Sequence, residues 1–211
     1  MTKPKLDIEH LITAKFTNLI DDEDHFLQAA HLQNETITQL ELAHPILEDC
    51  LVEHFNFNDC DFNKFEASNT IFKNCDFSNC RLDQASLYHV SFQNCKLVGT
   101  VLDHSYFNEV SFSGCLMDLA TLNKCQIKAA EFIETHLEDA SIDDTKIKKI
   151  SFDHCQLNQL SLMFTKLKGI DVSSCQFKRL EVDYAQLRGL IVNSEQAALL
   201  GQLYLGLKLT D

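Results

Sequence analysis

Residues 55–80 read FNFNDCDFNKFEASNTIFKNCDFSNC, and large apolar side chains recur there at every fifth position. An α-helix turns residues five apart to directions about 140° from each other, and a β-strand puts them on opposite faces. Neither element explains the pattern. A chain that turns a corner every five residues does explain it, because two residues of each five then point inward.

The same period continues outward from this stretch. Positions whose numbers end in 2 or 7 are all apolar from Phe57 to Val192. Positions ending in 0 or 5 hold only small or apolar residues from Phe55 to Leu190, with Cys, Ala and Thr frequent. The other three positions of each five carry every charged residue and every His of that span. We therefore predict two buried columns of side chains and a polar exterior.

Four such sides close a coil of about 20 residues, so residues about 20 apart should stack on one another. This register predicts an aromatic ladder and a thiol ladder inside the repeat. The predicted core residues are Phe72, Phe92, Phe112, Phe132, Phe152, Cys75, Cys95 and Cys115. We interpret the nine cysteines as small, buried, reduced thiols; disulfides, a redox function or metal binding are the alternatives.

Corner positions should favour residues that tolerate a positive φ. Positions ending in 4 or 9 carry many Asn, Gly, Asp and His residues, among them His44, His54, His89, His104 and His154. We assign these histidines a backbone role. No catalytic residue, metal site or cofactor is predicted, and the protein is expected not to be an enzyme.

Units such as CDFNK (60–64), CDFSN (75–79) and CKLVG (95–99) resemble the A(D/N)LXX consensus of pentapeptide-repeat proteins. The resemblance implies an all-β fold, a right-handed quadrilateral β-helix. The pattern is strict over 55–192 and continues loosely back to residue 26. Glu35 and Pro45 occupy small-residue positions of the first coils and weaken the pattern there.

A solenoid needs caps, because an open coil exposes unpaired strand edges. We expect an N-terminal cap (1–25), the repeat β-helix (26–193) and a C-terminal segment (194–211). The apolar residues of the N-terminal cap follow helical spacing. They are Ile8, Leu11, Ile12, Phe16, Leu19 and Ile20.

Asn193 or Ser194 is predicted to cap a short helix that runs to about Leu200 and ends at Gly201, with a strand over Leu203–Leu209. The segment is more apolar than a cap requires, which predicts a symmetric homodimer through the C-terminal ends. The expected interface residues are Ala197, Leu199, Leu200, Leu203, Tyr204 and Leu205.

Three outward aromatic residues, Phe164, Tyr184 and Tyr204, are spaced by 20 and should stack on one corner near that end. We interpret them either as a partner or dimer contact or as a corner packed under the C-terminal segment.

Two stretches, KLKGIDVSSCQF (166–177) and LRGLIVNSEQAALL (187–200), resemble the Qnr and MfpA-type quinolone-resistance proteins within the family, especially the Qnr-like proteins of Gram-positive bacteria. This resemblance implies a dimeric rod that binds DNA gyrase and topoisomerase IV, mimics DNA and relieves inhibition by fluoroquinolones. The register never slips between Phe55 and Val192, which leaves no room for the projecting loops of the Gram-negative Qnr proteins.

The net charge of −13 suits an acidic, DNA-like surface and opposes direct binding of nucleic acid. The stretch EFIETHLEDASIDD (131–144) has six carboxylates and no Lys or Arg. We predict that it forms the topoisomerase-binding patch; the alternative is a solvated face that keeps the protein soluble. The residues are Glu131, Glu134, Glu138, Asp139, Asp143 and Asp144.

The face centred on Ala67 is basic instead, with Lys146, Lys148, Lys149, Lys166, Lys168 and Arg188 in its C-terminal half. Because it lacks interleaved aromatic residues and belongs to an acidic protein, we favour contact with an acidic patch of a partner over nucleic acid.

No apolar run approaches the about 18 residues that span a bilayer, and the N-terminus lacks a signal-peptide pattern. We expect a soluble, cytoplasmic protein without membrane contact. The alternative function is a structural or scaffolding rod with an unrelated protein partner, because a fold does not determine a function.

Overall fold

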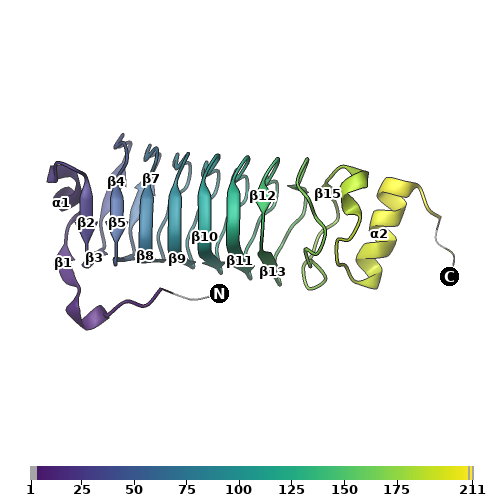
Figure 1. Ribbon diagram of the computed structural model, residues 1–211, viewed down its shortest axis with the longest axis horizontal. Coiled ribbons are helices and arrows are strands. Elements are labelled where there is room, and N and C mark those ends of the chain that lie inside the picture. Colours follow the sequence, from purple (N-terminus) through teal and green to yellow (C-terminus); the bar gives the residue numbers. More distant parts are fainter. Residues whose placement is uncertain (1–3, 209, 211) are drawn as a thin grey trace.

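The computed structural model describes residues 4–208 and 210. The chain forms a rod of about eight stacked coils, with the N-terminal cap at one end and helix α2 at the other (Figure 1). The strands are β1 (Ile12–Ala14), β2 (Phe26–Gln28), β3 (Ala30–Gln33), β4 (Thr36–Thr38), β5 (Ile46–Glu48), β6 (Leu51–Glu53), β7 (Asn56–Asn58), β8 (Glu66–Lys73), β9 (Ser86–Gln93), β10 (Tyr106–Ser113), β11 (Gln126–Ile133), β12 (Lys146–Ile147), β13 (Ile150–Asp153), β14 (Leu160–Ser161) and β15 (Leu180–Glu181). The helices are η1 (Ile8–His10), α1 (Phe16–Asp21), η2 (Tyr184–Leu187) and α2 (Ser194–Leu205).

The strands pair in parallel with the predicted register, in which each residue lies beside the residue twenty positions away. Phe72 pairs with Phe92, and Phe92 pairs with Phe112. Strands β8 to β11 each turn a corner and cover two adjacent faces. In these coils the other two faces are held by single bridges such as Asp76–Lys96. The predicted β-helix is confirmed.

The aromatic ladder forms as predicted. The rings of Phe72, Phe92, Phe112 and Phe132 stack with centroids 4.9 to 5.0 Å apart, and Phe152 follows at 5.2 Å from Phe132. All five side chains are buried. The ladder runs through successive coils, so each coil buries apolar surface against its two neighbours.

The corners adopt the left-handed conformation that the sequence suggested. The five predicted corner histidines have φ between 52° and 60°. At Gly99 a side chain would also meet the preceding coil, because a Cβ there would lie 2.8 Å from Oδ1 of Asn79.

The N-terminal cap differs from the expected helix. Helix α1 covers only Phe16–Asp21, while Ile12–Ala14 forms strand β1 and pairs with β3. Ile8 and Ile12 are exposed. The helical spacing was misleading because the open edge of β3 offers hydrogen-bond partners to residues 12–14, whereas a short isolated helix is marginal in water.

Phe16 and Leu19 of α1 are buried and close the first coils. The Phe16 ring lies 5.3 Å from that of Phe57, in an edge-to-face arrangement. Glu35, which the sequence marked as an exception, accepts the backbone N–H of Phe16 with both carboxylate oxygens at 3.3 Å. The residue that departs from the repeat pattern thus binds the N-terminus of α1.

The C-terminal helix is longer than predicted. Asn193 caps it in a capping box with Gln196, as expected, but α2 continues through Gly201 to Leu205 and ends at Gly206 with φ 64°. Gly201 lies close to Leu207, whose Cδ1 would be 3.0 Å from a Cβ there. The predicted strand is therefore wrong for the part that lies in α2, and its last residue, Leu209, lies outside the described residues.

Candidate functional site

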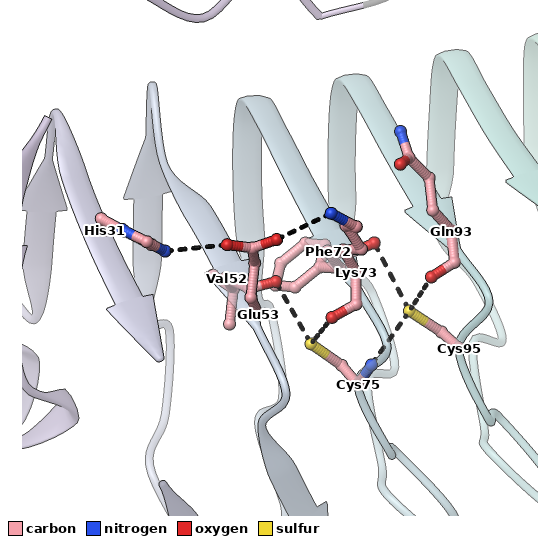
Figure 2. Close-up of polar contacts among 8 residues, drawn as sticks. All are labelled: His31, Val52, Glu53, Phe72, Lys73, Cys75, Gln93 and Cys95. Carbon is pink, nitrogen blue, oxygen red and sulfur yellow. Dashed lines mark hydrogen bonds and ion pairs between the residues drawn. The ribbon is translucent and has the colours of Figure 1, made fainter. Parts of the chain in front are cut away.

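The inward cysteines serve the structure of the coil. Cys75 Sγ lies 3.3 Å from the carbonyl oxygen of Val52, and Cys95 Sγ lies 3.4 Å from that of Phe72 (Figure 2). Thr135 donates in the same way to Phe112 at 3.2 Å. Cys, Ser and Thr recur in this column because each is small and directs a donor at a carbonyl of the preceding coil. Sequence reasoning recognised their size and missed this hydrogen bond.

Two of the thiols, those of Cys50 and Cys125, are poor nucleophiles. All nine cysteines are free and buried. Burial raises the pKa of Cys50 to about 11 and that of Cys125 to about 12, so both stay protonated at neutral pH. Within the described part of the chain, no three His, Cys, Asp or Glu side chains form a group that could hold a metal ion.

One charged cluster lies on the outside of the first coils. Glu53 bridges His31 and Lys73, each at 3.0 Å, across three successive coils (Figure 2). Burial raises the pKa of Glu53, but the hydrogen bonds from Lys73 and then His31 outweigh it and hold the pKa below its usual value. The cluster ties coils together and offers no reactive group.

The predicted acidic patch occupies one coil and extends around three of its four sides. Strand β11 places Glu131 on the side of Phe132, and the corner at Glu134 leads to the next side. Glu134, Glu138, Asp139 and Asp144 are exposed, and Glu131 and Asp143 are half-buried. We name this set the acidic coil. It covers three sides of the rod and does not form a single flat patch.

Two members of the acidic coil also accept hydrogen bonds from the following coil. Asp143 Oδ1 accepts hydrogen bonds at 2.7 Å from the backbone N–H of Met163 and the hydroxyl of Ser161. Asp139 accepts a hydrogen bond from Gln159 at 2.6 Å. Asp143 is therefore a structural residue, and the exposed carboxylates of the set are Glu134, Glu138, Asp139 and Asp144.

The predicted dimer residues divide into two groups. Leu200 is buried against the last coil, and the Tyr204 hydroxyl donates to the carbonyl of Leu180. Ala197, Leu203 and Leu205 are exposed, and Leu199 is half-buried. A stripe of Gln196, Leu200 and Tyr204 thus docks α2 on the rod, and the leucines on its other sides face outward.

The predicted aromatic corner holds only in part. Phe164 and Tyr184 are exposed, but Tyr204 leaves the series because α2 carries it back onto the coil. None of the helices within residues 4–208 and 210 is long and apolar enough to cross a bilayer.

A protein-family comparison also finds the repeat. Residues 67–141 and 85–162 match the family model for a pentapeptide repeat region. No curated protein matches the chain.

Among solved structures, one match is HetL, a pentapeptide repeat protein involved in heterocyst differentiation regulation from Nostoc sp. strain PCC 7120. It is 21% identical to this chain with a TM-score of 0.49, and the alignment covers 71% of this chain and 75% of the HetL chain. A trypsin-treated variant of QnrB1, a plasmid-mediated fluoroquinolone resistance protein, is 18% identical with a TM-score of 0.46 and covers 86% of this chain and 90% of its own. Nothing about function follows from likenesses this weak. The five-residue period, the four-sided coil and the family match together identify residues 67–162 as a pentapeptide-repeat region.

Proposed function

We propose that the protein is a non-enzymatic, DNA-mimicking regulator that binds DNA gyrase or topoisomerase IV and protects the enzyme from fluoroquinolones. The observation that carries the proposal is the acidic coil on a rigid rod. The sequence resemblance at 166–177 and 187–200 supports the choice of partner.

The charge density of the acidic coil suits mimicry. Duplex DNA carries one charge per about 1.7 Å, hence about three in the about 4.8 Å that one coil adds to the rod. The acidic coil concentrates six carboxylates in residues 131–144. Because four of the six are exposed on successive sides, a groove that normally closes around DNA would meet negative charge from several directions.

A symmetric dimer belongs to the same proposal. Leu203 and Leu205 are 47% and 63% exposed on α2, and Leu207 beyond it is 52% exposed. Exposed leucines gathered at one end of a monomer mark a surface that another molecule can cover. Two copies joined by these ends would make a longer rod with an acidic coil in each half.

A scaffolding rod is the second candidate, and Asp143 favours it. A carboxylate that binds Met163 and Ser161 has a sufficient structural reason to be acidic. The remaining acidic residues would then solubilise the rod.

The test is gyrase supercoiling in the presence of ciprofloxacin across a titration of the purified protein. We expect rescue of supercoiling at low protein and inhibition only at higher protein. The decisive variant neutralises the other five carboxylates of the acidic coil and keeps Asp143: Glu131→Gln, Glu134→Gln, Glu138→Gln, Asp139→Asn and Asp144→Asn. We expect it to stay folded and to lose at least tenfold in protective potency.

A matched control removes the same number of exposed carboxylates elsewhere, through Asp21→Asn, Glu23→Gln, Glu41→Gln, Asp59→Asn and Glu195→Gln. It should protect like the natural sequence. Equal losses in both variants would mean that total charge and not the acidic coil matters. No effect of the natural protein on gyrase or on topoisomerase IV would leave the scaffolding function.

A further inference from the structure

The face centred on Ala67 carries two columns of basic residues along the C-terminal half of the rod. With a twenty-residue register, Lys146 follows Gln126 in one column. The columns hold Lys146 and Lys166 in the first and Lys128, Lys148, Lys168 and Arg188 in the second. We name these six residues the basic columns; all six are exposed.

The basic columns have no internal counterions. Elsewhere on the rod, Lys73 pairs with Glu53, Arg81 with Asp83 and Arg179 with Glu181. Among the described residues, no member of the basic columns lies within ion-pair distance of a carboxylate. Like charges stacked at the spacing of neighbouring strands cost stability. An arrangement that is unfavourable in the free protein becomes favourable when an anionic partner binds.

The columns border a groove of about 590 Å³. Its lining includes Lys128, Lys148 and Lys166, and aromatic rings flank it at Tyr106 and Phe164. Phe164 is 69% exposed although it lies on a corner of a regular coil. The sequence pattern showed no aromatic residues between the lysines of this face, but the structure places Tyr106 and Phe164 beside them.

An irregularity of the backbone lies at the groove. In the pairing of β10 with β11, Asn108 is opposite Ala129 in place of Lys128, and the twenty-residue register returns at Val110 and Ala130. Over the next coil the continuous strand divides into β12 and β13, with Lys148 and Lys149 between them. The groove therefore coincides with a local change in the coil as well as with its charge.

We propose that this groove binds an extended, acidic segment of a partner protein, with the carboxylates of the segment on the basic columns and an apolar side chain against Phe164 and Tyr106. Tyr106 and Lys166 are three coils apart, a length of about 14 Å, which suits about four extended residues. Recognition depends on side chains, because the backbone of this face is engaged in the stacking of the coils.

The surroundings favour an acidic peptide over nucleic acid. Asp144 also lines the groove, and the same face carries Glu66 and Glu109 beyond Tyr106. A phosphate backbone would place charge against these carboxylates along its whole length. A peptide can place its acidic residues on the basic columns and have neutral or basic residues where it passes Asp144. The net charge of −13 adds to the repulsion of a long polyanion.

The experiment measures fluorescence anisotropy of a labelled acidic decapeptide with six glutamates and two phenylalanines, mixed with the full-length protein at low salt. A peptide with lysine in place of glutamate and a twelve-nucleotide oligothymidine serve as comparison probes. We expect the acidic peptide to bind, the basic peptide not to bind at this face, and the acidic binding to weaken as salt is added.

The groove variant carries Lys128→Gln, Lys148→Gln and Lys166→Gln, and the matched control carries Lys73→Gln, Lys96→Gln and Lys178→Gln at exposed positions of other faces. We expect at least a tenfold loss of affinity in the groove variant, less than about a twofold loss in the control, and about a threefold loss in Phe164→Ala. No binding, equal losses in both lysine variants, or tighter binding of the oligothymidine would overturn the proposal. The inference does not depend on topoisomerase binding, since the probe and the residues differ from those of the supercoiling test.

Discussion

The two ends of the rod cover their last coils in different ways. At the N-terminus, α1 inserts Phe16 and Leu19 among the phenylalanines of the first coils, and Glu35 accepts the first backbone N–H of that helix. At the C-terminus, α2 lies across the last coil and docks through Gln196, Leu200 and Tyr204. The N-terminal cap is held by an apolar plug, the buried side chains of Phe16 and Leu19. The C-terminal cap is held largely by hydrogen bonds.

The two caps also differ in where they leave apolar surface. The N-terminal cap buries Phe16 and Leu19 and leaves Ile8 and Ile12 exposed. The C-terminal helix covers the last coil and leaves Leu203 and Leu205 exposed at the end of the rod. In the dimer proposed above, a second molecule covers these two leucines. Four predictions test this contrast, beginning with the largest expected effect.

Phe16→Ala should destabilise the N-terminal coils by about 3–5 kcal/mol, because it empties a buried aromatic site. Urea unfolding followed by circular dichroism measures the loss, and hydrogen exchange should show earlier opening of β2 to β7 than of β11. Ile12→Ala, at a residue 70% exposed in the same cap, is the control and should cost at most about 0.5 kcal/mol. Similar losses for both would mean that Phe16 does not act as a plug.

Gln196→Ala should cost about 2–3 kcal/mol. Its side-chain amide donates to the buried carbonyls of Val172 at 2.9 Å and Cys175 at 2.8 Å, and both would lose a partner. Gln202→Ala changes an exposed glutamine of the same helix and should be nearly neutral. Urea unfolding of the two variants compares them directly; a neutral Gln196→Ala would show that apolar contacts alone hold α2.

Alkaline pH should weaken the core between the two caps. The pKa of Cys50 is about 11 and that of Cys125 about 12, against 9.0 for an ordinary thiol. Raised pKa values give stability that is complete below pH 9 and is lost as the pH rises towards these values, since ionisation then favours the unfolded chain. By pH 10 the loss should be about 1 kcal/mol per thiol.

Urea unfolding at pH 8, 9 and 10 measures this slope, and a Cys50→Ser, Cys125→Ser double variant should flatten it. An unchanged slope in the double variant would assign the alkaline loss to other groups.

Leu203→Glu with Leu205→Glu should leave the fold of the monomer nearly unchanged, within about 0.5 kcal/mol, because both residues are exposed. The expected effect is on assembly: sedimentation should change from dimer to monomer. The control pair, Ile12→Glu and Leu119→Glu, alters residues that are 70% and 59% exposed away from the C-terminal end. A monomer in the natural protein, or dissociation in both variants, would contradict a dimer through α2.

Much of the molecule could be predicted from residue order, because the repeat is local. Each five-residue unit contains its own inward pair and its own corner, so Phe112 or His104 could be placed without knowing the rest of the chain. The acidic coil was visible for the same reason. Its division into exposed carboxylates and a structural Asp143 was not visible, since that depends on Met163 and Ser161 in the following coil.

The residues alone were sufficient for the register, the ladder and the corners, because a period of five leaves a single way to bury two columns along one rod. Only the tertiary structure decided the ends and the groove. Glu35 became a helix cap, Tyr204 turned inward, and Phe164 came beside the basic columns through contacts between residues about 20 apart or more. These contacts involve residues that depart from the repeat or lie outside it, so the periodic pattern does not predict them.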